Sequence, residues 1–150
     1  MKVVIQRVSK AKVEVNDSVI CKINQGFLIL LGIENSDSQV DINWLVSKIS
    51  NLRVFSDDEL KMNLSIKDVK GEIIVVSQFT LHAKTKKGNR PSYKNAANPE
   101  YAKPLYDEFI SKLKNESGVN VKSGIFGANM QLTIVNDGPV TIIIDSKNKQ

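Results

Sequence analysis

Sulfur and imidazole ligands are scarce in this sequence of 150 residues, which contains one cysteine, Cys21, and one histidine, His82. A lone cysteine excludes a disulfide within the chain, and this supply of ligands is too small for a structural zinc site. We therefore expect neither a bound metal ion nor a cofactor.

Long apolar runs are also absent. No stretch approaches the roughly 20 consecutive apolar residues that a membrane-spanning helix needs. Residues 1–7 are typical of a strand and lack the apolar core and the small-residue cleavage site of a secretory signal. We therefore expect a cytoplasmic protein that does not contact a membrane.

The remaining composition is ordinary for a globular domain, with 41% apolar and 25% charged residues. A chain of 150 residues can bury a substantial core within one domain. No internal repeat or linker divides it. We therefore expect a single domain over residues 1–150.

The net charge of +5 is unevenly distributed. One polar stretch that also holds Gly88, Asn89 and Pro91 carries five positive charges, on Lys84, Lys86, Lys87, Arg90 and Lys94. This stretch is either a basic loop that attracts a polyanion or a solvated loop whose charges keep the protein soluble. It contains too few aromatic residues to stack several bases.

The hydrophobic pattern predicts mostly strands. Residues 26–33 are continuously apolar, which is typical of a central strand covered on both faces. Strands are also expected in the alternating segment 3–15 and in five shorter segments, 19–23, 52–55, 119–122, 130–135 and 140–144.

Two helices are predicted between these strands. Ser38 followed by Asp41 resembles a capping box before a helical stripe of Ile42, Leu45, Val46 and Ile49. Asn98 and Pro99 form a typical start for the second helix. The expected fold is a mostly β member of the α+β class, with a mixed, barrel-like sheet and two main helices.

Two distant segments concentrate polar and backbone-shaping residues beside apolar strands. Residues 77–80 follow the strand 73–76, which we expect to continue to Leu81, and residues 136–141 precede the strand 142–144. Both segments should lie at strand ends, where a rigid sheet holds them still, and we expect them to meet.

Residues 77–80 offer the chemistry of an ester-binding site. Gln78 and the backbone N–H groups of Phe79 and Thr80 are suited to stabilising an oxyanion. On a continuing strand Thr80 and His82 would share a face, so His82 is a candidate base, although a surface histidine leaving the strand is the more frequent case. The Phe79 side chain either lines an apolar pocket or fills the core, and core filling is the more frequent case.

Six segments together resemble the D-aminoacyl-tRNA deacylases of bacteria and eukaryotes. They are VIQRV at 4–8, KMNLS at 61–65, VVSQFTL at 75–81, KGNRPS at 87–92, FGANM at 126–130 and VNDGPVT at 135–141. The resemblance extends almost from end to end. It implies hydrolysis of the ester between a D-amino acid and the terminal adenosine of tRNA, by a homodimer that requires no metal.

The resemblance also implies roles for individual residues. Gly138 and Pro139 would form a cis peptide that enters the active site of the partner subunit and enforces chirality. The acyl group and adenosine would be held by Ser77, Gln78, Phe79 and Thr80. A pocket on the adenosine side would be shaped by Phe126, Ala128 and Met130. The basic residues of the loop, Lys84, Lys86, Lys87 and Arg90 among them, would bind tRNA.

Several alternatives stay open at this point. Thr80 is either a nucleophile that forms an acyl-enzyme or a positioning group while the ribose 2′-hydroxyl, or water that it positions, assists. The residues alone also allow a non-catalytic RNA-binding module or an esterase for a small metabolite. A gate that works by steric collision should not reject glycine, so cleavage of glycyl-tRNA, including glycine mischarged on tRNA-Ala, is expected.

Overall fold

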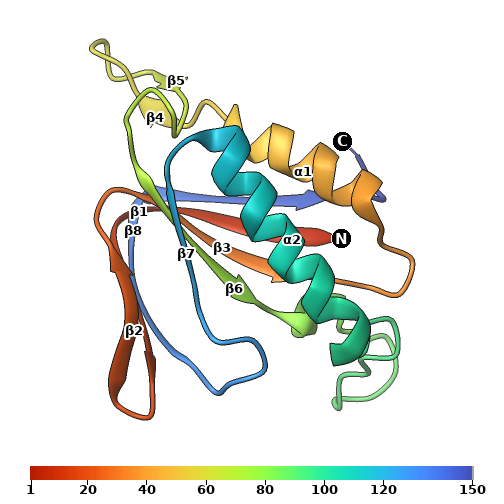
Figure 1. Ribbon diagram of the computed structural model, residues 1–150. Coiled ribbons are helices and arrows are strands. Elements are labelled where there is room, and N and C mark those ends of the chain that lie inside the picture. Colours follow the sequence, from red (N-terminus) through yellow and green to blue (C-terminus); the bar gives the residue numbers. More distant parts are fainter. Residues whose placement is uncertain (150) are drawn as a thin grey trace.

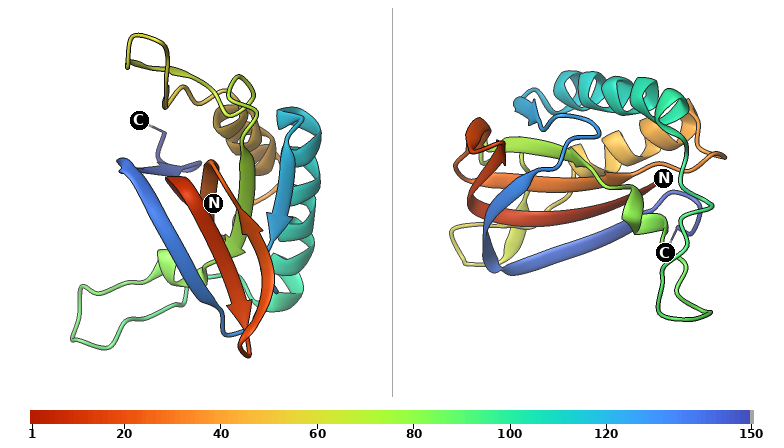
Figure 2. Two further views of the ribbon diagram at one scale, coloured as in Figure 1. Left: turned by 90° about the vertical axis from the view of Figure 1, so that its left-hand side faces the viewer. Right: turned by 90° about the horizontal axis from the view of Figure 1, so that it is seen from below.

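The computed structural model describes residues 1–149 and is built around a mixed, strongly twisted β-sheet (Figure 1). The strand order is β2-β1-β3-β6-β7, and β8 pairs with the free side of β1. These strands are β1 (Lys2–Val15), β2 (Ser18–Ile23), β3 (Gly26–Gly32), β6 (Glu72–Ser77), β7 (Asn120–Ser123) and β8 (Gln131–Asp145). The sheet is nearly closed, as the two views of Figure 2 show, which confirms the predicted barrel-like α+β fold.

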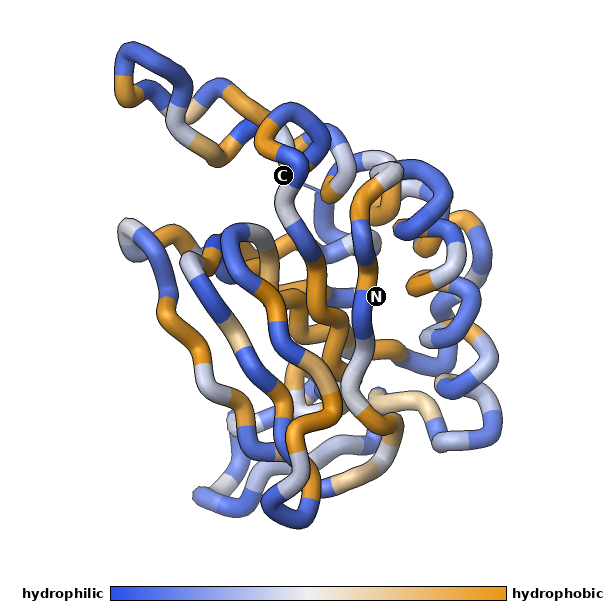
Figure 3. Tube along the Cα trace, turned by 60° about the vertical axis from the view of Figure 1, so that its left-hand side comes forward, coloured by the Kyte–Doolittle hydropathy of each residue, from blue (hydrophilic) through white to orange (hydrophobic). Residues whose placement is uncertain are grey.

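The long strand β1 organises the antiparallel half of the sheet. It pairs with β8 from Lys2 to Glu14 on one side, and with β3 and then β2 on the other. Polar and apolar residues alternate along these strands (Figure 3). Because successive side chains of a strand point to opposite faces, this alternation places one face toward the core.

The parallel half of the sheet consists of β3, β6 and β7. Every residue of β3 is buried except Leu30, which is half-buried, so the prediction of a central strand covered on both faces is confirmed. Parallel neighbours need long crossover connections. The segment between β3 and β6 contains α1 (Gln39–Ser50), and the segment between β6 and β7 contains α2 (Pro99–Ser117).

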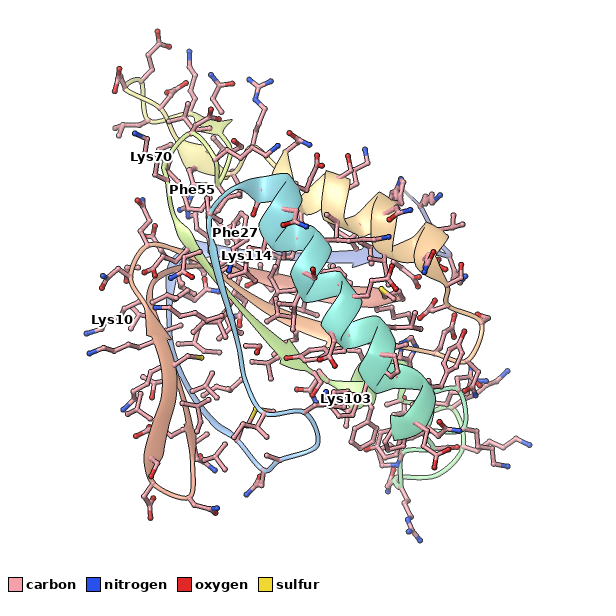
Figure 4. The ribbon with its side chains drawn as sticks, viewed as in Figure 1. Lys10, Phe27, Phe55, Lys70, Lys103 and Lys114 are labelled. Atoms are coloured by element: carbon pink, nitrogen blue, oxygen red, sulfur yellow. The ribbon has the colours of Figure 1, made fainter. Side chains whose placement is uncertain are left out.

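Both helices cover the same face of the sheet (Figure 1) and begin as the sequence predicts. The Asp41 carboxylate accepts the backbone N–H of Ser38 at 2.9 Å, and the Asn98 side chain accepts that of Tyr101 at 2.9 Å. The predicted stripe of α1 is buried. Phe27 and Phe55 lie in the core beneath the helices, with ring centroids 5.0 Å apart (Figure 4).

The structure corrects four predicted strands. The strand expected at 52–55 is reduced to β4 (Phe55–Ser56), which pairs with β5 (Met62–Leu64) in a hairpin. The two strands expected at 130–135 and 140–144 are parts of the continuous β8. The strand expected to reach Leu81 ends with β6, and a short 3₁₀ helix, η1 (Phe79–His82), follows it. Among residues 1–149, no helix is long and apolar enough to cross a membrane.

A buried polar network joins β1, the start of α1 and the end of β8. The Met1 ammonium donates to the Asp37 carboxylate and, at 3.0 Å, to the Ser146 hydroxyl. Ser146 donates to Asp41 at 2.7 Å, and the Lys147 ammonium reaches the other Asp41 oxygen at 2.9 Å. Burial by itself raises the pKa of Asp41, but hydrogen bonds from Ser146, Lys147 and Ser38 outweigh it and hold the pKa well below its ordinary value.

We predict that Asp41→Asn lowers the free energy of unfolding at pH 7 by about 2 kcal/mol, because hydrogen bonds to a charged group are lost. Since folding lowers this pKa, the carboxylate stabilises the protein above the ordinary value of 3.8 and loses this effect as the pH falls below it. Urea unfolding between pH 3 and 7 measures the difference between wild type and variant. Asp58→Asn, an exposed acid, is the matched control, and a difference that stays constant with pH would contradict the assignment.

Candidate active site

A cavity of about 590 Å³ lies where β6 ends, between η1 and the loop that joins β7 to β8. It brings together six of the predicted site residues. Ser77, Gln78 and Phe79 line one side, and a second side is lined by Phe126, Ala128 and Met130. The end of β3 and the start of α2 complete the lining of the cavity with mostly apolar side chains. An apolar cavity with a few polar groups at its edge is the usual form of a small-molecule site.

The first wall forms because the parallel ladder stops there. The Gln78 N–H donates to the Leu31 carbonyl at 2.8 Å, and β3 ends one residue later. Beyond this point the chain turns into η1, which brings Ser77 into the cavity beside Gln78. A Cβ on Gly32 would lie 3.0 Å from the Gln78 carbonyl oxygen, so glycine lets η1 pack closely against β3.

Two backbone donors remain available at this turn. Within residues 1–149, the N–H groups of Phe79 and Thr80 donate to no protein acceptor, because they begin the 3₁₀ helix. The Gln78 amide donates a short hydrogen bond to the Thr80 hydroxyl. The Thr80 hydroxyl therefore accepts from the Gln78 side chain. The two free backbone N–H groups can bind a carbonyl oxygen and stabilise the negative charge that develops on it.

His82 does not lie where the sequence places it. It is 5% exposed, so the expectation of a surface histidine is wrong. Because residues two apart in a 3₁₀ helix face different directions, the shared face expected for Thr80 and His82 is also wrong. The His82 Nδ1 atom lies 3.9 Å from the Glu34 carboxylate. Among residues 1–149, no three potential metal ligands are grouped.

Of the two alternatives for the Phe79 side chain, core filling is wrong. The side chain lines the cavity instead and is 56% exposed, because the chain leaves the sheet at η1. Its ring meets that of Tyr93 edge to face, with centroids 5.0 Å apart and an interplanar angle of 75°. Both aromatic residues line the cavity. Tyr93 was not identified from the sequence.

The second wall is held by α2. Phe126 packs against Tyr106, with ring centroids 5.4 Å apart. The buried Tyr106 hydroxyl donates to the Val75 carbonyl at 2.8 Å. Burial, with a smaller contribution from Asp107, raises the pKa of Tyr106, so this hydroxyl keeps its proton. Tyr106 therefore fixes the second wall relative to the strand that carries the first.

Within one chain, residues 136–141 do not line the cavity beside residues 77–80. Gly138 and Pro139, whose peptide bond is cis, are exposed and do not line the cavity. Antiparallel pairing explains this separation. It sets the corner of β8 beside residues 6–8 of β1, whereas the cavity lies at the end of β3, which pairs with Lys2 and Val3.

Arg7 holds this corner. Its Nε atom donates to the Asp137 carbonyl at 3.2 Å and lies 3.3 Å from the Asp137 carboxylate. Its Nη1 atom donates to the Val54 carbonyl at 2.6 Å. Gly138 has a φ of +122°, and a Cβ there would lie 2.8 Å from the guanidinium. The sequence contains one hint of this role, because Arg7 is a charged residue that falls on the same face of the first strand as Val3 and Ile5.

The basic stretch forms an exposed loop that extends away from the sheet (Figure 2), and Phe79 and Ala97, on either side of it, line the cavity. It leaves from η1, closes on itself at a bridge between Lys84 and Ser92, and returns where the Ala97 N–H donates to the Ile33 carbonyl at 3.0 Å. All five of its charged residues are exposed, namely Lys84, Lys86, Lys87, Arg90 and Lys94.

Comparison with known proteins identifies the family. The model described as D-Tyr-tRNA(Tyr) deacylase matches residues 4–145. The chain belongs to this family. The D-aminoacyl-tRNA deacylase of Flavobacterium psychrophilum is 64% identical over 150 residues, with 100% of both chains covered. The protein of the same name from Finegoldia magna is 55% identical over 149 residues, which cover 99% of this chain and 100% of that one.

Two solved structures share the fold of this chain. The c-Myc DNA Unwinding Element Binding Protein is 42% identical, with a TM-score of 0.91 over 97% of this chain and 98% of that one. A probable eukaryotic D-amino acid tRNA deacylase is 19% identical, with a TM-score of 0.81 over 95% of this chain and 97% of that one. At this identity the second likeness shows the fold alone.

The structure of this deacylase-family chain separates its six motifs into two groups. Residues 76–79 and 126–130 line the cavity, whereas Thr80 and Leu81 do not, and residues 87–92 belong to the loop beside it. Residues 4–8 and 135–141 meet where the first half of β1 pairs with β8. The remaining motif, which the sequence left unassigned, contains β5 in the hairpin that follows Val54.

Proposed function

We propose that this chain hydrolyses the ester bond that joins a D-amino acid to the 3′-terminal adenosine of tRNA. Its family supports the reaction, and the observation that carries the proposal is the pair of free N–H groups on Phe79, which lines the cavity, and on Thr80, the residue after it. The products are a free D-amino acid and tRNA. Such a substrate implies action in the cytoplasm, and no metal or cofactor takes part.

In the proposed reaction, the ester carbonyl oxygen accepts the two free N–H groups. A water oxygen bonds to the carbonyl carbon, the bond to the ribose 3′-oxygen breaks, and that oxygen leaves with a proton. The adenosine occupies the side lined by Phe126, Ala128 and Met130. Because the Thr80 hydroxyl accepts from Gln78 and has no adjacent base, we assign proton transfer to the ribose 2′-hydroxyl or to water that it positions.

The basic loop supports a tRNA substrate. Its exposed charges flank the cavity, where they can contact phosphates and release counterions. Binding that weakens steeply with salt is therefore expected. An esterase for a small metabolite would not show this dependence.

We further propose that the active unit is a homodimer in which the corner at Gly138 and Pro139 enters the cavity of the second copy. The corner is exposed and held by Arg7. Ile143, between the corner and the end of β8, is 72% exposed, which is unusual for a large aliphatic side chain. Among the described strands, β8 pairs only with β1, so its other edge is open to a partner.

The corner supplies a physical basis for chirality. Backbone carbonyls of Gly138 and Pro139 would accept the substrate ammonium, and the rigid prolyl segment would collide with an L side chain but not with a D side chain. Glycine has no side chain to collide. Glycyl-tRNA, including glycine mischarged on tRNA-Ala, is therefore a substrate in this proposal.

We predict rapid release of amino acid from D-tyrosyl-tRNA, release from L-tyrosyl-tRNA that is slower by about 100-fold or more, and clear release from glycyl-tRNA. The measurement uses labelled amino acids and a time course at several enzyme concentrations. Tight binding of D-tyrosyl-tRNA without release would indicate a binding module and overturn the proposal. If glycyl-tRNA is not cleaved at high enzyme concentration, the steric gate at Gly138 and Pro139 is contradicted, but the hydrolysis of D-tyrosyl-tRNA is not.

We predict that Thr80→Ala retains D-tyrosyl-tRNA hydrolysis within about tenfold, because it keeps the backbone donor. Comparison of Phe79→Pro with Phe79→Ala isolates the Phe79 N–H, because both variants lose the ring and only the proline variant loses the N–H. The first position of a helix tolerates proline. We expect Phe79→Pro to hydrolyse the substrate about 100-fold more slowly than Phe79→Ala. Mass spectrometry that detects an acyl group on Thr80 would refute this mechanism.

We predict that Ile143→Glu converts a dimer to a monomer and lowers hydrolysis by about 100-fold, because a charge is buried at the interface. Light scattering and the release assay on the same samples test this. Val40→Glu is the matched control, since Val40 is 73% exposed on α1 and outside the proposed interface. A monomeric Ile143→Glu variant with full activity would contradict the dimer proposal.

A further inference from the structure

We propose that the aromatic pair of Phe79 and Tyr93 forms a stacking site for the nucleobase immediately 5′ of the terminal adenosine of tRNA. The pair lines the cavity, and its rings stand edge to face with centroids 5.0 Å apart. This inference rests on the proposed function, since it concerns the same substrate beyond its terminal nucleoside.

The exposure of the pair points to a ligand. Phe79 is 56% exposed and Tyr93 is 37% exposed, although both adjoin an apolar cavity that buries their neighbours. The other aromatic pairs in contact are less exposed, since Phe27 and Phe55 are buried and Phe126 packs on the buried Tyr106. Two exposed rings that meet edge to face offer a ring face to a ligand, with the polar Tyr93 hydroxyl close by.

The surrounding charge favours a nucleic acid as this ligand. Tyr93 belongs to the loop that carries Lys84, Lys86, Lys87, Arg90 and Lys94, and Lys94 is its neighbour in sequence. Aromatic rings beside exposed cations match a single strand, whose bases stack while its phosphates meet the charges. The tertiary structure supplies the aromatic platform that the loop alone lacks, because η1 brings Phe79 to Tyr93.

The connectivity of the substrate selects the base. When the terminal adenosine lies in the cavity, a single phosphate links it to the preceding nucleotide. That nucleotide must therefore lie at the rim, beside the pair. Because every base has a π-face, the site holds the strand without selecting its sequence.

The test uses three D-tyrosyl esters, each cleaved at the same bond: adenosine, the dinucleotide cytidylyl-adenosine, and the same dinucleotide without its 5′ base. The kcat/KM for the ester of cytidylyl-adenosine is divided by that for the ester of the dinucleotide without its 5′ base. This ratio measures the effect of the base, because both substrates carry the same phosphate. We expect a ratio of about tenfold in the wild type and a value near 1 in Tyr93→Ala, since loss of an aromatic partner removes the stacking. Tyr93→Phe should restore the wild-type ratio.

Two further variants sharpen the test. Tyr93→Leu keeps an apolar contact with Phe79 but has no flat face, so its ratio should also be near 1 even if Tyr93→Ala is unstable. Tyr101→Ala removes a tyrosine that is 43% exposed outside the cavity, and it should keep the wild-type ratio.

The outcomes separate this inference from the proposed function. A wild-type ratio near 1, or an unchanged ratio in Tyr93→Leu, would overturn the stacking site while hydrolysis persists. If Tyr93→Leu slows all three esters equally and lowers the dimer content, the pair contacts the second copy and the inference is wrong. Failure to cleave any of the three D-esters would instead count against the proposed function.

Discussion

The hydrogen bond from the Gln78 N–H to the Leu31 carbonyl is the last connection of the parallel ladder, and the candidate site depends on it. Up to Val75, β6 has a neighbouring strand on both sides, and as far as Ser77 it is still paired with β3. Beyond it β3 has ended, and the chain turns into a 3₁₀ helix whose first donors have no partner within residues 1–149. A folded protein rarely leaves such groups unused. Here one of them belongs to Phe79, which lines an apolar cavity, and a carbonyl oxygen bound there would satisfy it.

Rigidity around these donors comes from the core. Tyr106, fixed in α2, bonds to Val75 in β6 and packs against Phe126 on the opposite wall. The strand that carries the donors and the loop that faces them are therefore held by one buried side chain. A site that stabilises charge needs such fixed geometry, because donors that reorganise during the reaction lose most of their effect.

The long antiparallel pairing of β1 with β8 has the opposite consequence, because it separates functional segments instead of joining them. It places the corner at Gly138 and Pro139 beside residues 6–8 of β1, outside the lining of the cavity. There Arg7 binds both the corner and Val54, just before the β4–β5 hairpin. One chain thus presents a cavity and, apart from it, an exposed corner. This arrangement suits an assembly of two copies better than a site completed within one chain.

The sequence by itself determined the fold class, both helix starts, the buried strand β3 and the family, because these follow from local periodicity, capping residues and motifs in order along the chain. It also identified the residues that line both walls of the cavity. Only the tertiary structure decided where β6 stops, since that depends on the length of its neighbour β3. The tertiary structure also decided the burial of His82, the exposure of Phe79 and its contact with Tyr93, and the hydrogen bond of Arg7 to the corner. Each depends on groups far apart in sequence, which no local pattern encodes.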